Sequence, residues 1–285
     1  MNGFFLIDKK ENWTSRDVVT KLSHIFHIKK IGHAGTLDPF ATGLLLVAVN
    51  QATKAINFIE DYDKEYIATI KLGNKTDTGD KTGKTILEKD IPSIVIEDIK
   101  KVLDSFLGPQ LQTPPKYSAV HVNGVKAYKL MYRNEGISEG AIKPKEINVK
   151  NIELLSFNHQ DEITFKATVS KGTYLRVLGE DIAERLNTVG HLISLRRTKM
   201  GKLDVINAKD VLLVKEEDVI PISEILVDEF TLQVDDDMAI KIKNGVSFNK
   251  IKAPSNRILF IDKNNNALAI YERIDNRYIC KRGLW

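Results

Sequence analysis

The sequence of 285 residues predicts an α+β protein with a large first part and a small β-rich module at its end. Helical and strand-like segments are interleaved irregularly, without the steady strand–helix period that is typical of a doubly wound fold. After about residue 229 the apolar runs become short and β-like, and turn residues such as those at 263–266 separate them. We therefore expect one domain over residues 1–228 and a second over residues 229–285.

The spacing of apolar residues places the elements of the first domain in order. Residues 4–8 are predicted to form a strand. Thr14 or Ser15 can cap the following helix, in which apolar residues recur at helical spacing as far as Phe26. Further strands are expected at residues 43–49, 66–72, 147–154 and 163–169, and further helices at residues 96–106 and 175–186.

Two other segments have a distinct composition. Residues 121–146, approximately, are polar and contain three glycines, which predicts an insert that leaves the sheet. From Met238 to Trp285, ten Lys and Arg outnumber three Asp and Glu, although the whole chain has a net charge of only +4. This asymmetry indicates a basic C-terminal module, with an ordinary solvated domain as the alternative. Its strands are expected at residues 257–262, 267–271 and 278–280.

The composition argues against several classes of protein. No apolar run approaches the roughly 20 residues of a membrane helix, and residues 1–8 lack the basic start and apolar core of a signal peptide. Cys280 is the one cysteine, which excludes a disulfide framework and a cysteine-based zinc site and favours a cytoplasmic protein. His24 and His27 are three residues apart, but no further ligand accompanies them, so we expect no metal site.

One acidic residue stands in an unusual loop. Asp38 lies within Gly-His-Ala-Gly-Thr-Leu-Asp-Pro-Phe-Ala-Thr-Gly at residues 32–43, and an apolar run follows. Pro39 restricts its own φ and favours an extended conformation at Asp38, while the glycines allow a bulky group to approach the backbone. The segment therefore predicts a rigid loop that presents one carboxylate, rather than an ordinary Asp-Pro turn before a core strand.

Four further motifs follow along the chain. They are Asp-Lys-Glu-Tyr with Thr-Asp-Thr-Gly-Asp within 63–80, Thr-Pro-Pro-Lys-Tyr-Ser-Ala with Asn-Gly and Ala-Tyr within 113–128, Ser-Lys-Gly-Thr-Tyr-Leu-Arg at 170–176, and Leu-Arg-Arg-Thr at 195–198. Together with residues 32–43, they resemble the motifs of the tRNA pseudouridine-55 synthases of the bacterial TruB type. Five motifs in the family's order argue against a chance similarity, and the resemblance covers roughly residues 3–225.

The resemblance implies both a fold and an activity. The fold would be that of pseudouridine synthases, with a mixed, mainly antiparallel sheet and flanking helices, followed by a small PUA-like β domain that binds RNA. The activity would be the isomerisation of uridine 55 in the T loop of tRNA to pseudouridine, together with a tRNA-folding activity. By the same resemblance, the enzyme would act on tRNA as a cytoplasmic monomer, away from membranes and without a cofactor, guide RNA or protein partner.

The resemblance also assigns roles to single residues. Asp38 would be the catalytic nucleophile, Arg176 its charge partner, and Tyr66 a ring that stacks on the target base and accepts a proton from the sugar. Whether Asp38 attacks C1′ of the ribose or starts an elimination stays open. Substrate contacts are expected from His33, Asp80, Tyr174 and Leu195. Contacts with the RNA backbone are expected from Lys9, Arg196 and Arg197.

The chain departs from the family pattern near its start and in the insert, and two rival hypotheses remain. In the insert, His121 and Val125 stand at positions that are often basic in the family, so the insert is expected to grip RNA less tightly. In residues 8–15, Lys10 and Asn12 stand where the family has Pro and Gly, so the geometry of this turn is not predicted. The rivals are an RNA-binding or RNA-folding protein in which catalysis is secondary or lost, and a guide-RNA-dependent relative that acts in a complex. The presence of all three catalytic residues favours the enzyme over a binder, and the insert and the small C-terminal module favour a protein that acts alone.

Overall fold

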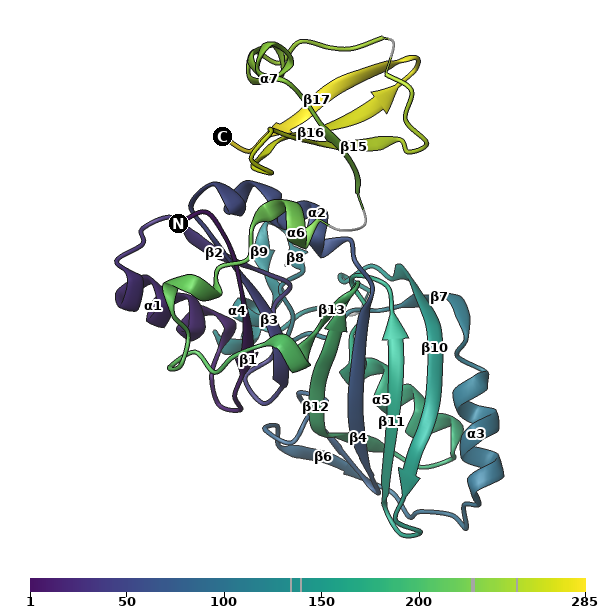
Figure 1. Cartoon of the computed structure of the whole chain (residues 1–285). Coiled ribbons are helices and arrows are strands. Elements are labelled where there is room, and N and C mark those ends of the chain that lie inside the picture. The colour runs from purple at the N-terminus through teal and green to yellow at the C-terminus, as the bar shows by residue number, and fades with distance from the viewer. Residues whose placement is uncertain (134, 139, 227–228, 250) are drawn as a thin grey trace. The chain divides into compact units, whose positions relative to one another are not determined.

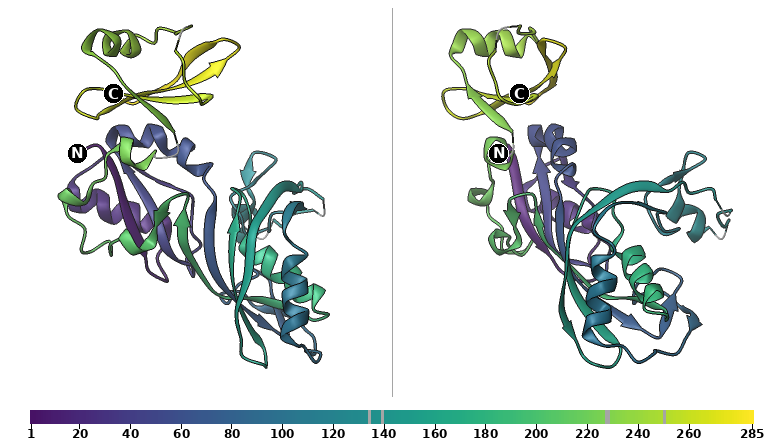
Figure 2. Two further views of the ribbon diagram at one scale, coloured as in Figure 1. Left: turned by 45° about the vertical axis from the view of Figure 1, so that its right-hand side comes forward. Right: turned by 90° about the vertical axis from the view of Figure 1, so that its right-hand side faces the viewer.

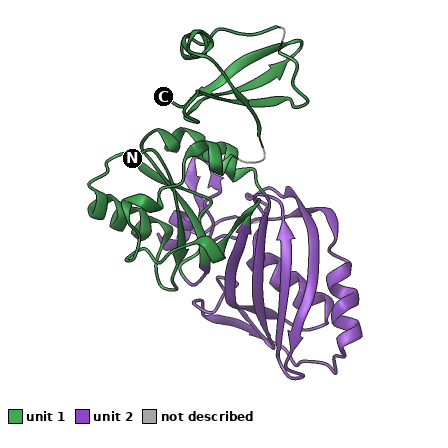
Figure 3. Cartoon of the chain, viewed as in Figure 1, with its two compact units in different colours: residues 1–39, 43–62, 200–285 green, residues 40–42, 63–199 purple. Residues whose placement is uncertain are grey.

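The computed structural model describes residues 1–285 except residues 134, 139, 227–228 and 250 (Figure 1). The chain separates into two compact units (Figure 3). The domain boundary expected after residue 228 falls at a position outside the described residues, and that division stays a prediction. The first unit comprises Met1–Pro39, Gly43–Tyr62 and Met200–Trp285, and the second comprises Phe40–Thr42 and Asp63–Lys199.

An antiparallel sheet and a capped helix form the N-terminal part of the first unit. β1 (Gly3–Lys9) and β2 (Ile31–Ala34) both pair with β3 (Thr42–Val49). The side chains at positions 44–49 of β3 are completely buried, which explains the continuous apolar run of this strand. A capping box begins α1 (Ser15–Phe26), because Thr14 Oγ1 accepts a hydrogen bond from the main chain three residues later and its own N–H is bonded in return.

The C-terminal part of the first unit is a small β module. β14 (Phe230–Gln233) runs parallel to β15 (Arg257–Ile261), and the antiparallel strands β16 (Ala267–Ile274) and β17 (Arg277–Gly283) complete the sheet. α7 (Asp236–Lys243) packs against β16. Other short elements of the first unit are η1 (Asn50–Ala55), α2 (Ile56–Glu60), β13 (Leu203–Asp204), η2 (Val205–Asn207), η3 (Glu216–Asp218) and α6 (Ile222–Ile225).

The second unit is built on a larger sheet. Its strand order is β12 (Gly190–Met200), β4 (Lys64–Leu72), β11 (Glu162–Val169), β10 (Lys145–Phe157) and β7 (Gly108–Gln112). Alternate residues of β4 and β11 are buried, because α3 (Ile96–Asp104) and α5 (Leu175–Arg185) cover one face of the sheet (Figure 2). Smaller elements are the hairpin of β5 (Asn74–Thr76) and β6 (Thr85–Glu88), the hairpin of β8 (His121–Val122) and β9 (Val125–Lys126), and α4 (Ala127–Tyr132).

The predicted α+β class and the small C-terminal β module are confirmed, as are the helices and strands predicted from apolar spacing, with shifted ends. Apolar spacing did not indicate β2, β7, β12 or α7, whose sequences mix glycine or charged residues with apolar ones. Within the part of the chain that the structure describes, no helix combines the length and the apolar character needed to cross a bilayer.

Candidate active site

Asp38 lies in the loop between β2 and β3, and a serine fixes the main chain on its N-terminal side. The Leu37 N–H donates to Ser15 Oγ at 2.9 Å, and the Ser15 hydroxyl donates to the Leu37 carbonyl at 3.2 Å. Ser15 and Leu37 are only 2% and 3% exposed. Breaking such buried hydrogen bonds leaves polar groups unsatisfied, so the backbone before Asp38 has little freedom to move.

The main chain on the other side of Asp38 is held by the end of β1. The Pro39 carbonyl accepts hydrogen bonds from Lys9 Nζ at 3.3 Å and from the Asn12 N–H at 2.9 Å. Lys9 Nζ also donates to the carbonyls of Lys10 at 3.0 Å and Trp13 at 2.6 Å. One buried ammonium group therefore ties the turn after β1 to the loop that carries Asp38.

The turn after β1 closes in spite of its departure from the family pattern. Asn12 has a φ of 65°, in the left-handed region that asparagine adopts more readily than most residues other than glycine. Asparagine can thus occupy the position where the family has glycine without disturbing the contacts of Lys9. The left-handed backbone of Asn12 therefore closes the turn at residues 8–15, whose geometry the sequence did not predict.

Arg176 is buried in the second unit and contacts residues of two other motifs. It lies in the first turn of α5 and is 5% exposed. Its Nη1 donates to the Thr78 carbonyl at 2.7 Å, its Nη2 donates to the Tyr117 carbonyl at 2.9 Å, and its Nε lies 3.9 Å from Asp80 Oδ2. The guanidinium therefore joins three of the motifs recognised in the sequence, because its partners come from residues 63–80 and 113–128.

Asp80 is fixed by its own loop. Its Oδ1 accepts hydrogen bonds from the Thr82 N–H at 2.9 Å, the Thr82 hydroxyl at 2.5 Å and the Thr78 hydroxyl at 3.0 Å. The same loop is bonded to β12, since the Leu192 N–H donates to the Gly79 carbonyl at 3.0 Å. Asp80 is 4% exposed, and the other oxygen of its carboxylate faces Arg176.

A glutamine that sequence reasoning missed fixes the start of α5. Gln112 on β7 accepts a hydrogen bond from the Tyr174 N–H at 2.8 Å and donates to the Tyr174 carbonyl at 3.1 Å. Gln112 is 5% exposed, and no side chain caps α5 at Tyr174. The amide thus positions the helix turn that carries Arg176. Only its place just before the Thr-Pro-Pro motif could have drawn attention to it.

Replacing Gln112 by Ala should lower the free energy of unfolding by about 2 kcal/mol, because Tyr174 loses two half-buried hydrogen bonds and its carbonyl keeps only the bond from the Leu178 N–H. Urea denaturation measures this loss. The matched control is Gln110→Ala on the same strand, which removes one half-buried hydrogen bond to the Phe106 carbonyl and should cost about 1 kcal/mol. Equal losses in the two variants would show that Gln112 has no special role.

The other expected site residues are distributed over both units. Tyr66 on β4 is 8% exposed and pairs with Ala167 of β11, and Leu195 on β12 is 6% exposed. Arg196 is half-buried, with Nη1 3.5 Å from the Thr42 hydroxyl. Lys9 and Arg197 are each 1% exposed, which favours a role inside the fold over one on the RNA backbone.

The structure brings part of the predicted site together within one unit. Asp80, Arg176 and the backbone of Tyr174 are linked within the second unit, which also contains Tyr66 and Leu195. Asp38, His33 and Lys9 belong to the first unit. The pairing of Asp38 with Arg176 therefore stays a prediction, to be tested by substitution.

Burial shifts the pKa values of two groups of the second unit, Tyr117 and Asp181. Burial raises the pKa of Tyr117, and the negative charge of Asp77 adds to the shift. Burial also raises the pKa of Asp181 on α5 to about 6, with nearby carboxylates of the same helix adding to it. Asp181 is therefore half protonated near pH 6, while Glu180 beside it pairs with Lys75 at 2.9 Å.

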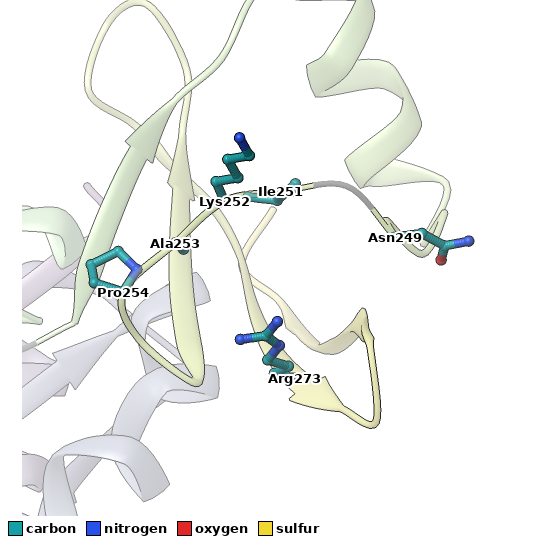
Figure 4. Close-up of a pocket in the computed structure, with 6 residues that line it drawn as sticks. All are labelled: Asn249, Ile251, Lys252, Ala253, Pro254 and Arg273. Atoms are coloured by element: carbon teal, nitrogen blue, oxygen red, sulfur yellow. The ribbon is translucent and has the colours of Figure 1, made fainter.

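The C-terminal module contains a basic cleft of about 790 Å³ (Figure 4). Lys252 and Arg273 supply its cationic side chains, and Asn249 and Pro254 line it further. Among the residues that the structure describes, no group of three or more His, Cys, Asp or Glu side chains is arranged to hold a metal ion. The cleft therefore offers cations and an amide to an anionic ligand.

Comparison with known proteins identifies the family. A family model described as TruB family pseudouridylate synthase (N terminal domain) matches residues 23–175, which are more than half of the chain and include Asp38, Tyr66 and Asp80. The chain belongs to the TruB family of pseudouridylate synthases. It is therefore a pseudouridine synthase, an isomerase, and the family predicted from the five motifs is confirmed.

Two relatives and one solved structure show how far the similarity extends. A protein named tRNA pseudouridine synthase B from Francisella philomiragia subsp. philomiragia is 44% identical over 218 residues, which are 74% of this chain and 71% of the relative. A protein of the same name from Onion yellows phytoplasma (strain OY-M) is 37% identical over 98% of both chains. A structure described as "Structure of H/ACA RNP bound to a substrate RNA containing 2'-deoxyuridine" has a TM-score of 0.74 over 99% of this chain and 85% of that chain. The two chains are 18% identical, so this likeness shows the fold alone.

Proposed function

We propose that this TruB-family protein converts uridine 55 in the T loop of tRNA to pseudouridine, with Asp38 as the nucleophile. The observation that carries the proposal is the loop around Asp38, whose main chain is fixed by Ser15 on one side and by Lys9 and Asn12 on the other. The relatives named tRNA pseudouridine synthase B support tRNA as the substrate.

The chemistry requires one well-placed carboxylate. The bond between C1′ of the ribose and N1 of uracil breaks, a bond between C1′ and C5 forms, C5 loses its proton, and N1 gains one. Atoms and electrons balance without an oxidant or reductant. A carboxylate can add to C1′ as a nucleophile or start an elimination from the sugar, and both routes use Asp38. A loop held in advance lowers the entropy that must be lost to reach the reacting geometry.

Arg176 and Tyr66 would complete the catalytic group. A guanidinium beside Asp38 would keep the carboxylate ionised in a site shielded from water, through a charge-assisted hydrogen bond. The two carbonyl partners of Arg176 support this role, because they fix the orientation of its planar group. Tyr66 would stack on the target base and accept the proton from the sugar.

The target uridine must leave its stack to reach Asp38, at a cost of a few kcal/mol. We assign His33 to the vacated place in the RNA, and Asp80, Tyr174 and Leu195 to the surroundings of the extruded base. Arg196 and the basic cleft of the C-terminal module would contact phosphates. These contacts should make binding weaken steeply with salt.

The same proposal covers how the protein acts in the cell. It would work as a cytoplasmic monomer, without a cofactor, guide RNA or protein partner. Opening the tRNA to extrude a uridine also disturbs the contacts around it, and we infer a tRNA-folding activity from this requirement. The basic character of residues 238–285, with ten Lys and Arg against three Asp and Glu, is the observation that favours extended contact with tRNA.

Tritium release from uridine labelled at C5 tests the proposal. A tRNA transcript with all its uridines labelled should lose one equivalent of tritium, because only the isomerised base exchanges its C5 proton. The control is the same transcript with cytidine at position 55, which should release none. Release from the control would contradict the assigned position, and no release from either transcript would contradict the proposed reaction.

A further inference from the structure

Thr78 contacts two charged groups of the second unit at once. Its carbonyl accepts a hydrogen bond from Arg176 Nη1 at 2.7 Å, and its hydroxyl donates to Asp80 Oδ1 at 3.0 Å. Arg176 and Asp80 are 5% and 4% exposed, whereas Thr78 is half-buried. Hydrogen bonds to charged groups are stronger than those between neutral groups, so this one threonine helps to fix where both charges lie.

A second threonine completes the contacts of the same carboxylate oxygen. Asp80 Oδ1 also accepts hydrogen bonds from the Thr82 hydroxyl at 2.5 Å and from the Thr82 N–H at 2.9 Å. Three donors therefore converge on Oδ1, while Oδ2 lies 3.9 Å from Arg176 Nε. We call Thr78 and Thr82 the threonine clamp. Because a carboxylate is planar, holding one of its oxygens also sets the direction in which the other oxygen faces.

The main chain that carries the threonine clamp is anchored at several points. The hydroxyl of Thr76, which is 4% exposed, donates to the Asp80 carbonyl at 2.8 Å. Leu192 on β12 holds the loop through two main-chain hydrogen bonds, one to the Gly79 carbonyl at 3.0 Å and one from the Lys81 N–H at 2.9 Å. The loop is therefore attached to the large sheet, and the clamp has a fixed base.

Gly83 leaves the space in which the threonine clamp closes. A Cβ at this position would lie 2.4 Å from Thr78 Oγ1, 2.4 Å from Asp77 Oδ1 and 2.9 Å from the Thr78 main-chain nitrogen. Contacts this short essentially never occur for a Cβ, and rotation of a side chain cannot relieve the last of them. The φ of Gly83 lies outside the left-handed region, so close approach, and not backbone conformation, requires a glycine here.

We propose that Thr78 is a positioning residue for the reaction, which holds the Asp80 carboxylate and the Arg176 guanidinium in the relative orientation that turnover needs. The proposal rests on the proposed function for the roles of Asp80 and Arg176. Thr82 assists by holding the same carboxylate oxygen, and Gly83 assists by leaving room for the Thr78 hydroxyl. A displacement of groups at the reacting centre by about 1 Å can slow a reaction up to about a hundredfold.

Removal of the Thr78 hydroxyl tests the proposal. Thr78→Val keeps the branched shape and the carbonyl that binds Arg176, and it should lower kcat about tenfold through the loss of one hydrogen bond to a charged group. KM should stay within about threefold, because affinity for tRNA comes mainly from phosphate contacts. Thr78→Ser restores a hydroxyl and should return kcat to within about threefold of wild type. A wild-type kcat for Thr78→Val, measured by tritium release at varied tRNA concentration, would overturn the proposal.

The matched control is another half-buried threonine of the second unit. Thr69 on β4 shares a hydrogen bond of 3.0 Å with the Thr164 hydroxyl on β11, and the alternation of the strand places it on the opposite face from Tyr66. Thr69→Val makes the same chemical change and removes a bond of the same length, so its kcat should stay near that of wild type. A fall in kcat as large as that of Thr78→Val would show a general loss of stability and would overturn the proposal.

Two further measurements follow the guanidinium itself. Gly83→Ala should also lower kcat about tenfold, because its methyl group displaces the Thr78 hydroxyl, and a wild-type kcat in this variant would contradict the proposal. The NMR signal of the Arg176 Nε–H group should shift in Thr78→Val and Gly83→Ala but not in Thr69→Val, and an unmoved signal would overturn the proposal. This signal needs no turnover, so a shift together with no tritium release by wild type would reject the proposed reaction and retain the link from Thr78 to Arg176.

Discussion

Asp38→Asn should lower turnover at least about a thousandfold while leaving tRNA affinity within about tenfold of wild type. The substitution keeps the size and shape of the side chain but removes the charge that either route of the reaction needs. The loop should remain in place, because the hydrogen bonds that hold the main chain of Leu37 and Pro39 are left intact by the substitution. Tritium release measures turnover, and anisotropy measures binding.

A second replacement separates the charge from the loop that presents it. Ser15→Ala removes both hydrogen bonds to Leu37 and leaves the Asp38 carboxylate intact, so it should slow turnover much less than Asp38→Asn. Normal turnover by Asp38→Asn would reject its role as nucleophile. A variant that binds and folds tRNA without isomerising it would in turn separate the two proposed activities.

Arg176→Lys should lower turnover at least about a hundredfold and reduce the free energy of unfolding by about 2–4 kcal/mol. The buried guanidinium donates to two carbonyls and faces Asp80, and a single ammonium cannot reproduce that planar arrangement. Either the Thr78 or the Tyr117 carbonyl would lose its partner. Urea denaturation and tritium release measure the two effects.

The matched control for Arg176 lies on the same helix. Arg185 ends α5, where it donates to the Ser105 hydroxyl and stacks over the Phe106 ring at 3.7 Å. Arg185→Lys should change stability by about 1 kcal/mol or less and leave turnover near that of wild type, because its hydrogen bonds to Ser105 are exposed. A loss of turnover as large as that of Arg176→Lys would mean that any change in α5 disturbs the site.

Much of the architecture was predictable because its signals are local. The apolar spacing in α1 and α5 and the alternation in β4 and β11 follow from the geometry of a helix and a strand. Asp38 was selected as the main candidate residue for another reason. Asp38 stands within a long motif, and the family that the motif resembles is confirmed by comparison.

Other features could not be predicted, since they depend on residues far apart in the chain. Gln112 fixes Tyr174 from 62 residues away, and Lys9 reaches the Pro39 carbonyl across 30 residues. No pattern marks either side chain as buried. Lys9 in particular was expected at the RNA backbone from the family resemblance. Its 1% exposure, unusual for a lysine, appears only when the turn after β1 closes around it.

The sequence by itself determined the fold class, the order of the main elements, the family and the carboxylate at position 38, since each depends on neighbouring residues or on an ordered set of motifs. Tertiary structure alone decided how that carboxylate's loop and the Arg176 guanidinium are held. The physical reason is that a buried hydrogen bond forms only where folding places donor and acceptor together, and its energy depends on their removal from water.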